Sequence, residues 1–128
     1  MDAAVHFLIV DDDPGIRALL HMALCAEDRH IREAPDGMCA LEMLRASTVP
    51  MIVLLDWQMP RLDGRGVLRA VAAEPQLAMT HRFVLITAND VAGDGEITTL
   101  LRDLQAPVIR KPFDLNTLFE VVADLIAR

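Results

Sequence analysis

Acidic residues directly follow two apolar runs of this sequence, in greater number than local structure needs. Asp11, Asp12 and Asp13 follow the first run, and Asp56 follows another. The N-terminus of a helix needs only one of the first three residues as a cap. If the others gather with Asp56, each close pair of carboxylates repels by about 1–4 kcal/mol. A hard divalent cation removes this repulsion, and Mg²⁺ usually takes one or two carboxylates together with phosphate oxygens.

With Mg²⁺ present, the residues that follow the apolar runs have the functional groups for phosphoryl transfer. Asp56 is a carboxylate nucleophile that could form an aspartyl phosphate. The ammonium of Lys111 could stabilise charge on the phosphoryl oxygens, and the hydroxyl of Thr87 could donate a hydrogen bond to one of them. A single Lys or Thr at the end of a strand is usually only solvated. The prediction of a site therefore depends on the joint placement of these groups.

Four apolar runs of strand length precede these residues, at Val5–Val10, Met51–Leu55, Arg82–Ile86 and Pro107–Ile109. Because the runs are largely apolar throughout and do not alternate, they indicate strands of a parallel sheet that is covered on both faces. A more polar run, His30–Ala34, is typical of an edge strand.

Segments with the apolar spacing of helices lie between the runs. Asp13 offers an N-cap, and Pro14 stands at the first helical position. The expected helices begin after Asp13, after Asp36, after Gly64, at about residue 92 and after Asp114. Five alternations of strand and helix predict an α/β fold with a doubly wound parallel sheet and helices on both faces. Ligands of such sheets lie beyond the carboxyl ends of the strands, so the polar residues named above are expected to meet there.

Composition limits the classes of protein further. The chain has 128 residues, 53% of them hydrophobic, which favours one folded domain over residues 1–128. A formal net charge of −7 disfavours a nucleic acid partner. With no apolar run of about 18 residues and no signal peptide, we expect a cytoplasmic location and no membrane partner. Cys25 and Cys39 lack metal-ligand spacing and are expected to be reduced core residues.

Four segments of the chain resemble the signature stretches of bacterial two-component receiver domains. They are FLIVDDDP, IVLLDWQMPRLDG, VLITAND and RKPF, and they occur in the order of the family with nearly its spacing. The resemblance covers almost the entire chain. It implies a flavodoxin-like fold with strand order 2-1-3-4-5, and a cytoplasmic switch that is controlled by phosphorylation.

The resemblance also implies roles for individual residues. Asp56 matches the aspartate that is phosphorylated, and Asp11 and Asp12 match the acidic pair that holds Mg²⁺ together with it. Gln58 would add its backbone carbonyl to the metal. Asp13 matches no ligand of the family and is interpreted as the helix cap.

The remaining matches concern the response to the phosphoryl group. Thr87 and Lys111 match the hydroxyl and the lysine that bind it, and the bond from Lys111 to Pro112 is typically cis in the family. Gln58 and Asn89 occupy the positions that tune the lifetime of the phosphoryl group.

Two features depart from the family pattern. Receivers commonly carry Tyr or Phe three residues before the lysine, where this chain has Val108, so the usual aromatic signal to the outer face is missing. Output is then expected through the loop after Thr87 and through the helix at about 92–104. That region is slightly longer than usual, lacks the common glycine-alanine turn before the last strand, and is expected to hold a short or mobile helix.

The resemblance implies partners as well. A sensor histidine kinase or a histidine phosphotransfer protein would donate the phosphoryl group, and the domain would catalyse only its own phosphorylation and dephosphorylation. A downstream target of unknown kind, or a second copy of the chain in a homodimer, would dock on the surface of the helix at about 92–104, the last strand and the last helix. Met1, close to the first strand, is expected of a natural N-terminus, whether the chain acts alone or within a larger regulator or hybrid kinase.

Two alternatives stay open at this point. A haloacid-dehalogenase-like phosphatase would use Asp11 and Asp13 as its Asp-x-Asp pair, but Gly15 stands where that family has Thr, no acidic pair follows a fourth strand, and no cap insertion is present. A pseudo-receiver would bind partners without phosphorylation. Its acidic set is usually damaged, whereas this one is intact, and Val108 is the feature that best supports it.

Overall fold

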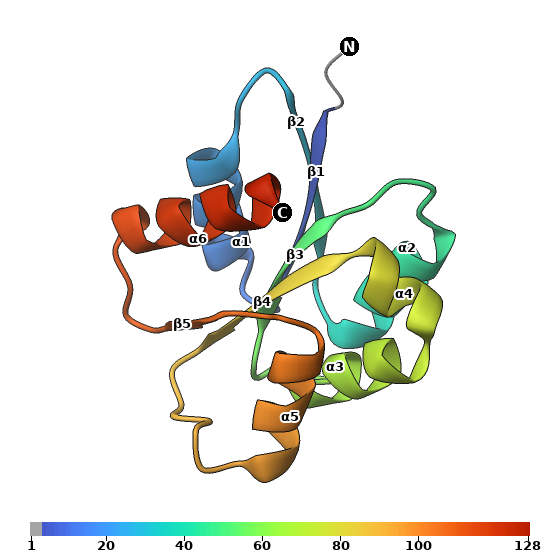
Figure 1. Ribbon diagram of the computed structural model, residues 1–128. Coiled ribbons are helices and arrows are strands. Elements are labelled where there is room, and N and C mark those ends of the chain that lie inside the picture. The colour runs from blue at the N-terminus through green and yellow to red at the C-terminus, as the bar shows by residue number, and fades with distance from the viewer. Residues whose placement is uncertain (1–3) are drawn as a thin grey trace.

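A parallel sheet of five strands in the order β2-β1-β3-β4-β5 forms the centre of the molecule (Figure 1). The computed structural model describes residues 4–128, so Met1 and the start of the expected domain lie outside the described residues. The strands are β1 Val5–Val10, β2 Arg29–Ala34, β3 Ile52–Asp56, β4 Arg82–Thr87 and β5 Val108–Arg110. The expected strand order is confirmed, and the bounds differ from the expected ones by one residue at most.

Helices connect consecutive strands, and a last helix follows β5. They are α1 Pro14–Leu24, α2 Gly37–Ala46, α3 Gly64–Ala73, α4 Pro75–Thr80, α5 Gly95–Asp103 and α6 Leu115–Ala127. All except α4 begin after an aspartate whose carboxylate accepts a backbone N–H of the first turn: Asp13, Asp36, Asp63, Asp94 and Asp114. No helix within residues 4–128 is long and apolar enough to cross a membrane.

The sheet separates two apolar cores. On one face, α1 and α6 pack against strand residues such as Phe7, Leu54 and Val84. On the other face, α2, α3, α4 and α5 pack against the alternate strand residues, including Leu8 and Leu55. Figure 1 shows this division of the helices between the two faces. Because both faces are covered, β1, β3 and β4 are almost entirely buried, which explains their unbroken apolar runs.

Three expectations from the sequence are wrong in detail. The chain has a further helix, α4, which the pattern did not reveal because only Leu77 of its six residues is buried. The helix expected from about residue 92 begins at Gly95, since Asp94 and not an earlier residue caps it. Cys25 ends α1 at the surface and is exposed, although both cysteines are free as expected.

The turn between α5 and β5 places Gln105 in the left-handed conformation, with φ of 54°. The Gln105 N–H donates to the Arg102 carbonyl at 3.1 Å, and the Ala106 N–H donates to the Leu101 carbonyl at 2.8 Å. A left-handed backbone favours glycine, and another residue there costs about 1–2 kcal/mol. The chain thus makes this turn without the glycine that receivers commonly place before the last strand.

Candidate phosphoacceptor and metal site

The carboxylates of Asp11, Asp12 and Asp56 gather at the carboxyl edge of the sheet. β1 and β3 are parallel neighbours whose register pairs Val10 with Leu55, so the next residues, Asp11 and Asp56, reach the edge side by side. One oxygen of each of the three carboxylates lies within 4.8 Å of the others. Asp11 and Asp56 are buried, whereas Asp12 is exposed to solvent. The structure therefore brings together the three acidic side chains that the sequence analysis named.

Local hydrogen bonds hold Asp11 in this position. The backbone N–H of Asp13 donates to Oδ1 of Asp11 at 2.9 Å, while the Asp13 carboxylate caps α1. Burial raises the pKa of the Asp11 carboxyl, and the charges of Asp56 and Asp12 raise it further, against the opposing effects of the Asp13 N–H and of Lys111. The charged form of the Asp11 carboxyl is therefore held in an unfavourable environment.

Lys111 approaches the cluster from the next-but-one strand. Its backbone N–H donates to the Thr87 carbonyl at 2.8 Å, which extends the β4–β5 ladder by one residue. The ammonium Nζ then donates to Oδ1 of Asp56 at 2.9 Å and lies 3.8 Å from Oδ2 of Asp11. The peptide bond between Lys111 and Pro112 is cis, as the resemblance implied. Lys111 thus contacts the candidate phosphoacceptor directly.

Thr87 lies at the same edge, at the end of β4, with only 1% of its surface exposed. Its hydroxyl oxygen accepts a hydrogen bond from the Asn89 N–H at 2.9 Å and lies 3.3 Å from the Asn89 carbonyl. The hydroxyl therefore contacts its own loop, and the structure does not bring it into hydrogen bonding with Asp56.

Gln58 and Asn89 line a cleft of about 120 Å³ beside Asp56, together with Trp57, Ala88 and Lys111. The cleft lies between the loop that follows β3 and the loop that follows β4. Two neutral amides thus border the cleft beside the Asp56 carboxylate.

The residues of the acidic cluster fit a hard divalent cation. The donor set consists of carboxylate oxygens, which Mg²⁺ prefers, and contains no histidine or cysteine. A cation between these carboxylates would also offset the repulsion and burial that raise the pKa of Asp11.

One residue that supports the site was not recognisable in the sequence. The Arg17 guanidinium, on the first turns of α1, donates to the main-chain carbonyl of Asp11 at 2.7 Å and to Oε1 of Glu33 at 3.1 Å. His21 contacts the other oxygen of Glu33 at 2.9 Å. No motif predicts such a contact, because an arginine one turn after a helix cap has many other available partners.

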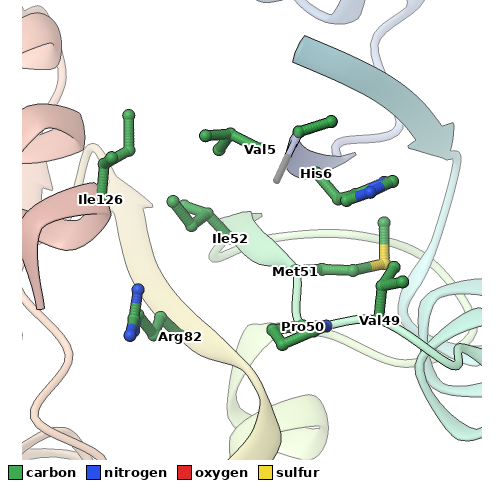
Figure 2. A pocket seen from close by; sticks show the side chains of 9 residues that line it. Val5, His6, Val49, Pro50, Met51, Ile52, Arg82 and Ile126 are labelled. Atoms are coloured by element: carbon green, nitrogen blue, oxygen red, sulfur yellow. The ribbon is translucent and has the colours of Figure 1, made fainter. Parts of the chain in front are cut away.

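A second hollow, of about 410 Å³, lies at the opposite edge of the sheet (Figure 2). It is formed where β1, β3 and β4 begin, with Val5, Ile52 and Ile126 among its lining residues. Arg82 borders it, but its guanidinium donates to the Leu125 carbonyl at 2.9 Å and so belongs to the end of α6. This hollow has no cluster of functional groups and lies away from Asp56.

The fold and its acidic edge define a flavodoxin-like domain of the doubly wound α/β class. The sequence matches the family described as the response regulator receiver domain over residues 7–123. The chain therefore belongs to the response regulator receiver family, as the resemblance of its four motifs indicated.

Curated relatives support this assignment and are much longer than the chain. The protein-glutamate methylesterase/protein-glutamine glutaminase 5 of Myxococcus xanthus is 34% identical over 97% of this chain, which spans 35% of that protein. The response regulator PleD of Caulobacter vibrioides is 36% identical over 95% of this chain, which spans 26% of that protein. The chain thus corresponds to about a third or less of these relatives.

A similar solved structure is the response regulator TrrA of Thermotoga maritima, described as a complex with Mg²⁺ and BeF. It is 27% identical, covers 94% of this chain and 98% of its own, and superimposes with a TM-score of 0.77. The shared fold extends over nearly all of both chains.

Proposed function

We propose that the chain is the phosphoryl-accepting receiver of a two-component phosphorelay, with Asp56 as the acceptor. The observation that carries this proposal is the contact of 2.9 Å between Lys111 Nζ and Asp56 Oδ1 inside a cluster of three carboxylates. A buried carboxylate with an ammonium on one side and a cation-binding set on the other is suited to a nucleophile that must approach a phosphoryl group.

The phosphodonor is a phosphohistidine of a histidine kinase or of a histidine phosphotransfer protein. An oxygen of the Asp56 carboxylate forms a bond to phosphorus as the bond from phosphorus to the imidazole nitrogen breaks, and the electron pair of that bond stays on the imidazole. Asp56 thereby becomes an acyl phosphate, and hydrolysis by water later returns it to the carboxylate with release of inorganic phosphate. The chain acts as a catalyst only on itself.

Mg²⁺ would be held by the Asp11, Asp12 and Asp56 carboxylates and by the main-chain carbonyl of Gln58. When bound, it would supply positive charge that neutralises the phosphoryl oxygens and the acidic cluster. The solved TrrA structure, described as a complex with Mg²⁺ and BeF, supports this assignment by similarity. Gln58 and Asn89 set the lifetime of the acyl phosphate, since they border the approach of water to Asp56.

The response to phosphorylation starts at Lys111 and Thr87. A phosphoryl group adds a charge of about −2 and three strong acceptor oxygens. Lys111 exchanges one Asp56 oxygen for a phosphoryl oxygen, and the Thr87 hydroxyl leaves Asn89 to donate to another. The loop after β4 then changes its position, which shifts the surface of α5, β5 and α6 between two arrangements. A downstream target or a second copy of the chain binds one of them.

Labelling with a small phosphodonor tests this function. Wild-type protein incubated with acetyl phosphate and Mg²⁺ is expected to gain the mass of one phosphoryl group, which hydroxylamine removes because it cleaves acyl phosphates. Asp56→Asn should gain none. Asp90→Asn, a matched change of an exposed carboxylate in the neighbouring loop, should label as wild type does. A pseudo-receiver would leave wild-type protein unlabelled, and a phosphatase that uses Asp11 would still label after Asp56→Asn.

A further inference from the structure

The side chain of Arg65 lies over the residue next to the candidate phosphoacceptor. Its guanidinium carbon is 5.3 Å from the centre of the Trp57 ring, a cation–π contact. Trp57 directly follows Asp56 and lines the same cleft. The Trp57 backbone is fixed on both sides, since its N–H donates to the Ile86 carbonyl at 3.0 Å and its carbonyl accepts from Gly64 at 2.9 Å. Arg65 therefore contacts a rigid part of the site.

The same guanidinium binds the start of α5. It forms an ion pair with Asp94 and another, of 2.8 Å, with Glu96. Asp94 is the N-cap of α5, and its other carboxylate oxygen accepts the Ile97 N–H at 3.1 Å. One side chain of α3 thus joins the Asp56 cleft to the first turn of α5.

Arg69, one turn further along α3, makes this attachment a network. It donates to both oxygens of Glu96, at 2.6 and 2.7 Å. Arg69 first, and Arg65 second, lower the pKa of the Glu96 carboxyl to about 2. A single exposed ion pair contributes little stability, but several charges in one network fix a geometry better. The network therefore defines where α5 sits against α3.

The loop 88–94 between β4 and α5 is held at both ends. At its start, the Thr87 hydroxyl contacts the backbone of Asn89. At its end, Asp94 is bound to Arg65. A short segment thus joins Thr87 to Asp94, which Arg65 attaches to α3. The same Arg65 side chain contacts Trp57.

The position that usually carries the switching aromatic ring holds a small aliphatic side chain here. Val108 is 37% exposed and has no ring that could move between an inner and an outer position. The only tryptophan of the chain, Trp57, lines the Asp56 cleft, with the Arg65 guanidinium over its ring.

We propose that Arg65 is the positioning residue that links the phosphorylation state of Asp56 to the orientation of α5, through its joint contacts with Trp57, Asp94 and Glu96. This inference rests on the proposed phosphoryl acceptance. In the unphosphorylated state Arg65 holds α5 in the position seen here. Once Thr87 leaves Asn89, the loop 88–94 withdraws Asp94 from Arg65, and α5 takes its second position. Because coupling is reciprocal, a partner that binds α5 also changes the energetics of phosphorylation.

Hydrogen–deuterium exchange of α5 in two variants tests the proposal. Arg65→Gln removes the charge and the stacked guanidinium. Asp94→Asn breaks the ion pair from the other side and keeps a good N-cap. In wild type, we expect amide exchange within residues 95–103 to change about fivefold or more on phosphorylation by acetyl phosphate. In both variants the ratio between the two states should fall to about one, because α5 is already released.

Two controls separate this effect from a general loss of stability. Arg45→Gln breaks an exposed arginine–glutamate pair of similar geometry elsewhere, with Glu74, and should keep the wild-type ratio. Arg65→Lys keeps a positive charge and should restore part of the response. The emission of Trp57 should shift in Arg65→Gln and not in Arg45→Gln.

Each result bears on a defined claim, because the mass of the protein reports phosphorylation before exchange is compared. Absence of label in wild type overturns the proposed function. Normal label in Arg65→Gln together with a wild-type change in α5 overturns the role of Arg65. The role of Arg65 is also overturned if amide exchange of α5 does not change when wild type is labelled. The same holds if Arg65→Gln takes no label while the other variants do, since Arg65 would then act on the acceptor and not on α5.

Discussion

The Lys111 ammonium and the Asp56 carboxylate are joined by a hydrogen bond of 2.9 Å although 55 positions of sequence separate them. β5 is not a neighbour of β3, so the lysine must reach across the end of β4. The lysine offsets the charge of the Asp56 carboxylate. Under the proposed function, the same ammonium is already placed to bind an oxygen of a phosphoryl group on Asp56.

Replacing Lys111 by Met is expected to slow phosphorylation without removing the acceptor. The side chain keeps its length but loses the ammonium that stabilises charge on the phosphoryl oxygens. Loss of one such donor typically costs about 10²–10³ in rate. The initial rate of mass gain with acetyl phosphate measures this effect, and Arg110→Met, on the neighbouring position, serves as a control. A wild-type rate in Lys111→Met would mean that the contact has no role in the reaction.

Replacing Arg17 by Gln is expected to weaken Mg²⁺ binding. The Arg17 guanidinium donates to the main-chain carbonyl of Asp11 at 2.7 Å and so holds the residue whose carboxylate is the proposed ligand. Loss of a group that orients a metal ligand typically costs about 10–100-fold in affinity. Trp57 adjoins the site, so its fluorescence should report the titration. His21→Gln, which changes only a contact with Glu33, should bind Mg²⁺ as wild type does. Equal Mg²⁺ affinities of Arg17→Gln and His21→Gln would show that Asp11 binds the metal without help from Arg17.

The stability of the fold should fall in mild acid because of His81. This residue is only 4% exposed; its Nδ1 accepts the Met51 N–H at 3.0 Å, and its Nε2 lies 3.3 Å from the Leu44 carbonyl. Burial lowers its pKa below the ordinary value of 6.5. The unfolded chain therefore binds the proton more readily, so this contribution is complete above pH 6.5 and is lost as pH falls towards the folded pKa.

Urea unfolding of wild type and His81→Gln at pH values above and below the ordinary histidine pKa measures this effect. The variant is expected to be less stable at neutral pH and to lack this part of the pH dependence. A pH dependence that is the same in both proteins would assign the acid effect to other groups.

Gln105→Gly is expected to stabilise the fold by about 1 kcal/mol, since glycine adopts the left-handed backbone of this turn without a steric cost. Gln105→Ala keeps the strained Cβ and should change the free energy of unfolding little. Urea unfolding of the two variants compares them directly. A loss of stability in the glycine variant would contradict the strain inferred at this residue.

Much of the fold was predictable because the signals are local. The apolar runs that form β1, β3 and β4 are unbroken because both faces of the sheet are covered, and an aspartate marks the start of each long helix. α4 was not predictable, since one buried residue, Leu77, makes no periodic pattern. The start of α5 was misplaced because its cap, Asp94, stands between two glycines. Glycine disfavours helix, so the sequence did not mark where the first turn begins.

The residues of the site also differ in how far the sequence predicts them. Asp11, Asp56, Thr87 and Lys111 were predictable because each ends a strand or directly follows one, and parallel strands end at one edge. The contacts of Arg17 and Arg65 were not, because each depends on the distance between two elements that the sequence leaves undefined. The partner of the Thr87 hydroxyl, the Asn89 backbone, was likewise set by the shape of a loop.

The location of the phosphoryl group tests the central claim most directly. Wild-type protein is labelled with acetyl phosphate and Mg²⁺, and borohydride then reduces the acyl phosphate to homoserine, which tandem mass spectrometry places in the sequence. We predict homoserine at position 56 and aspartate unchanged at positions 11 and 12. Homoserine at position 11, or a labelled protein without homoserine at position 56, would contradict the account.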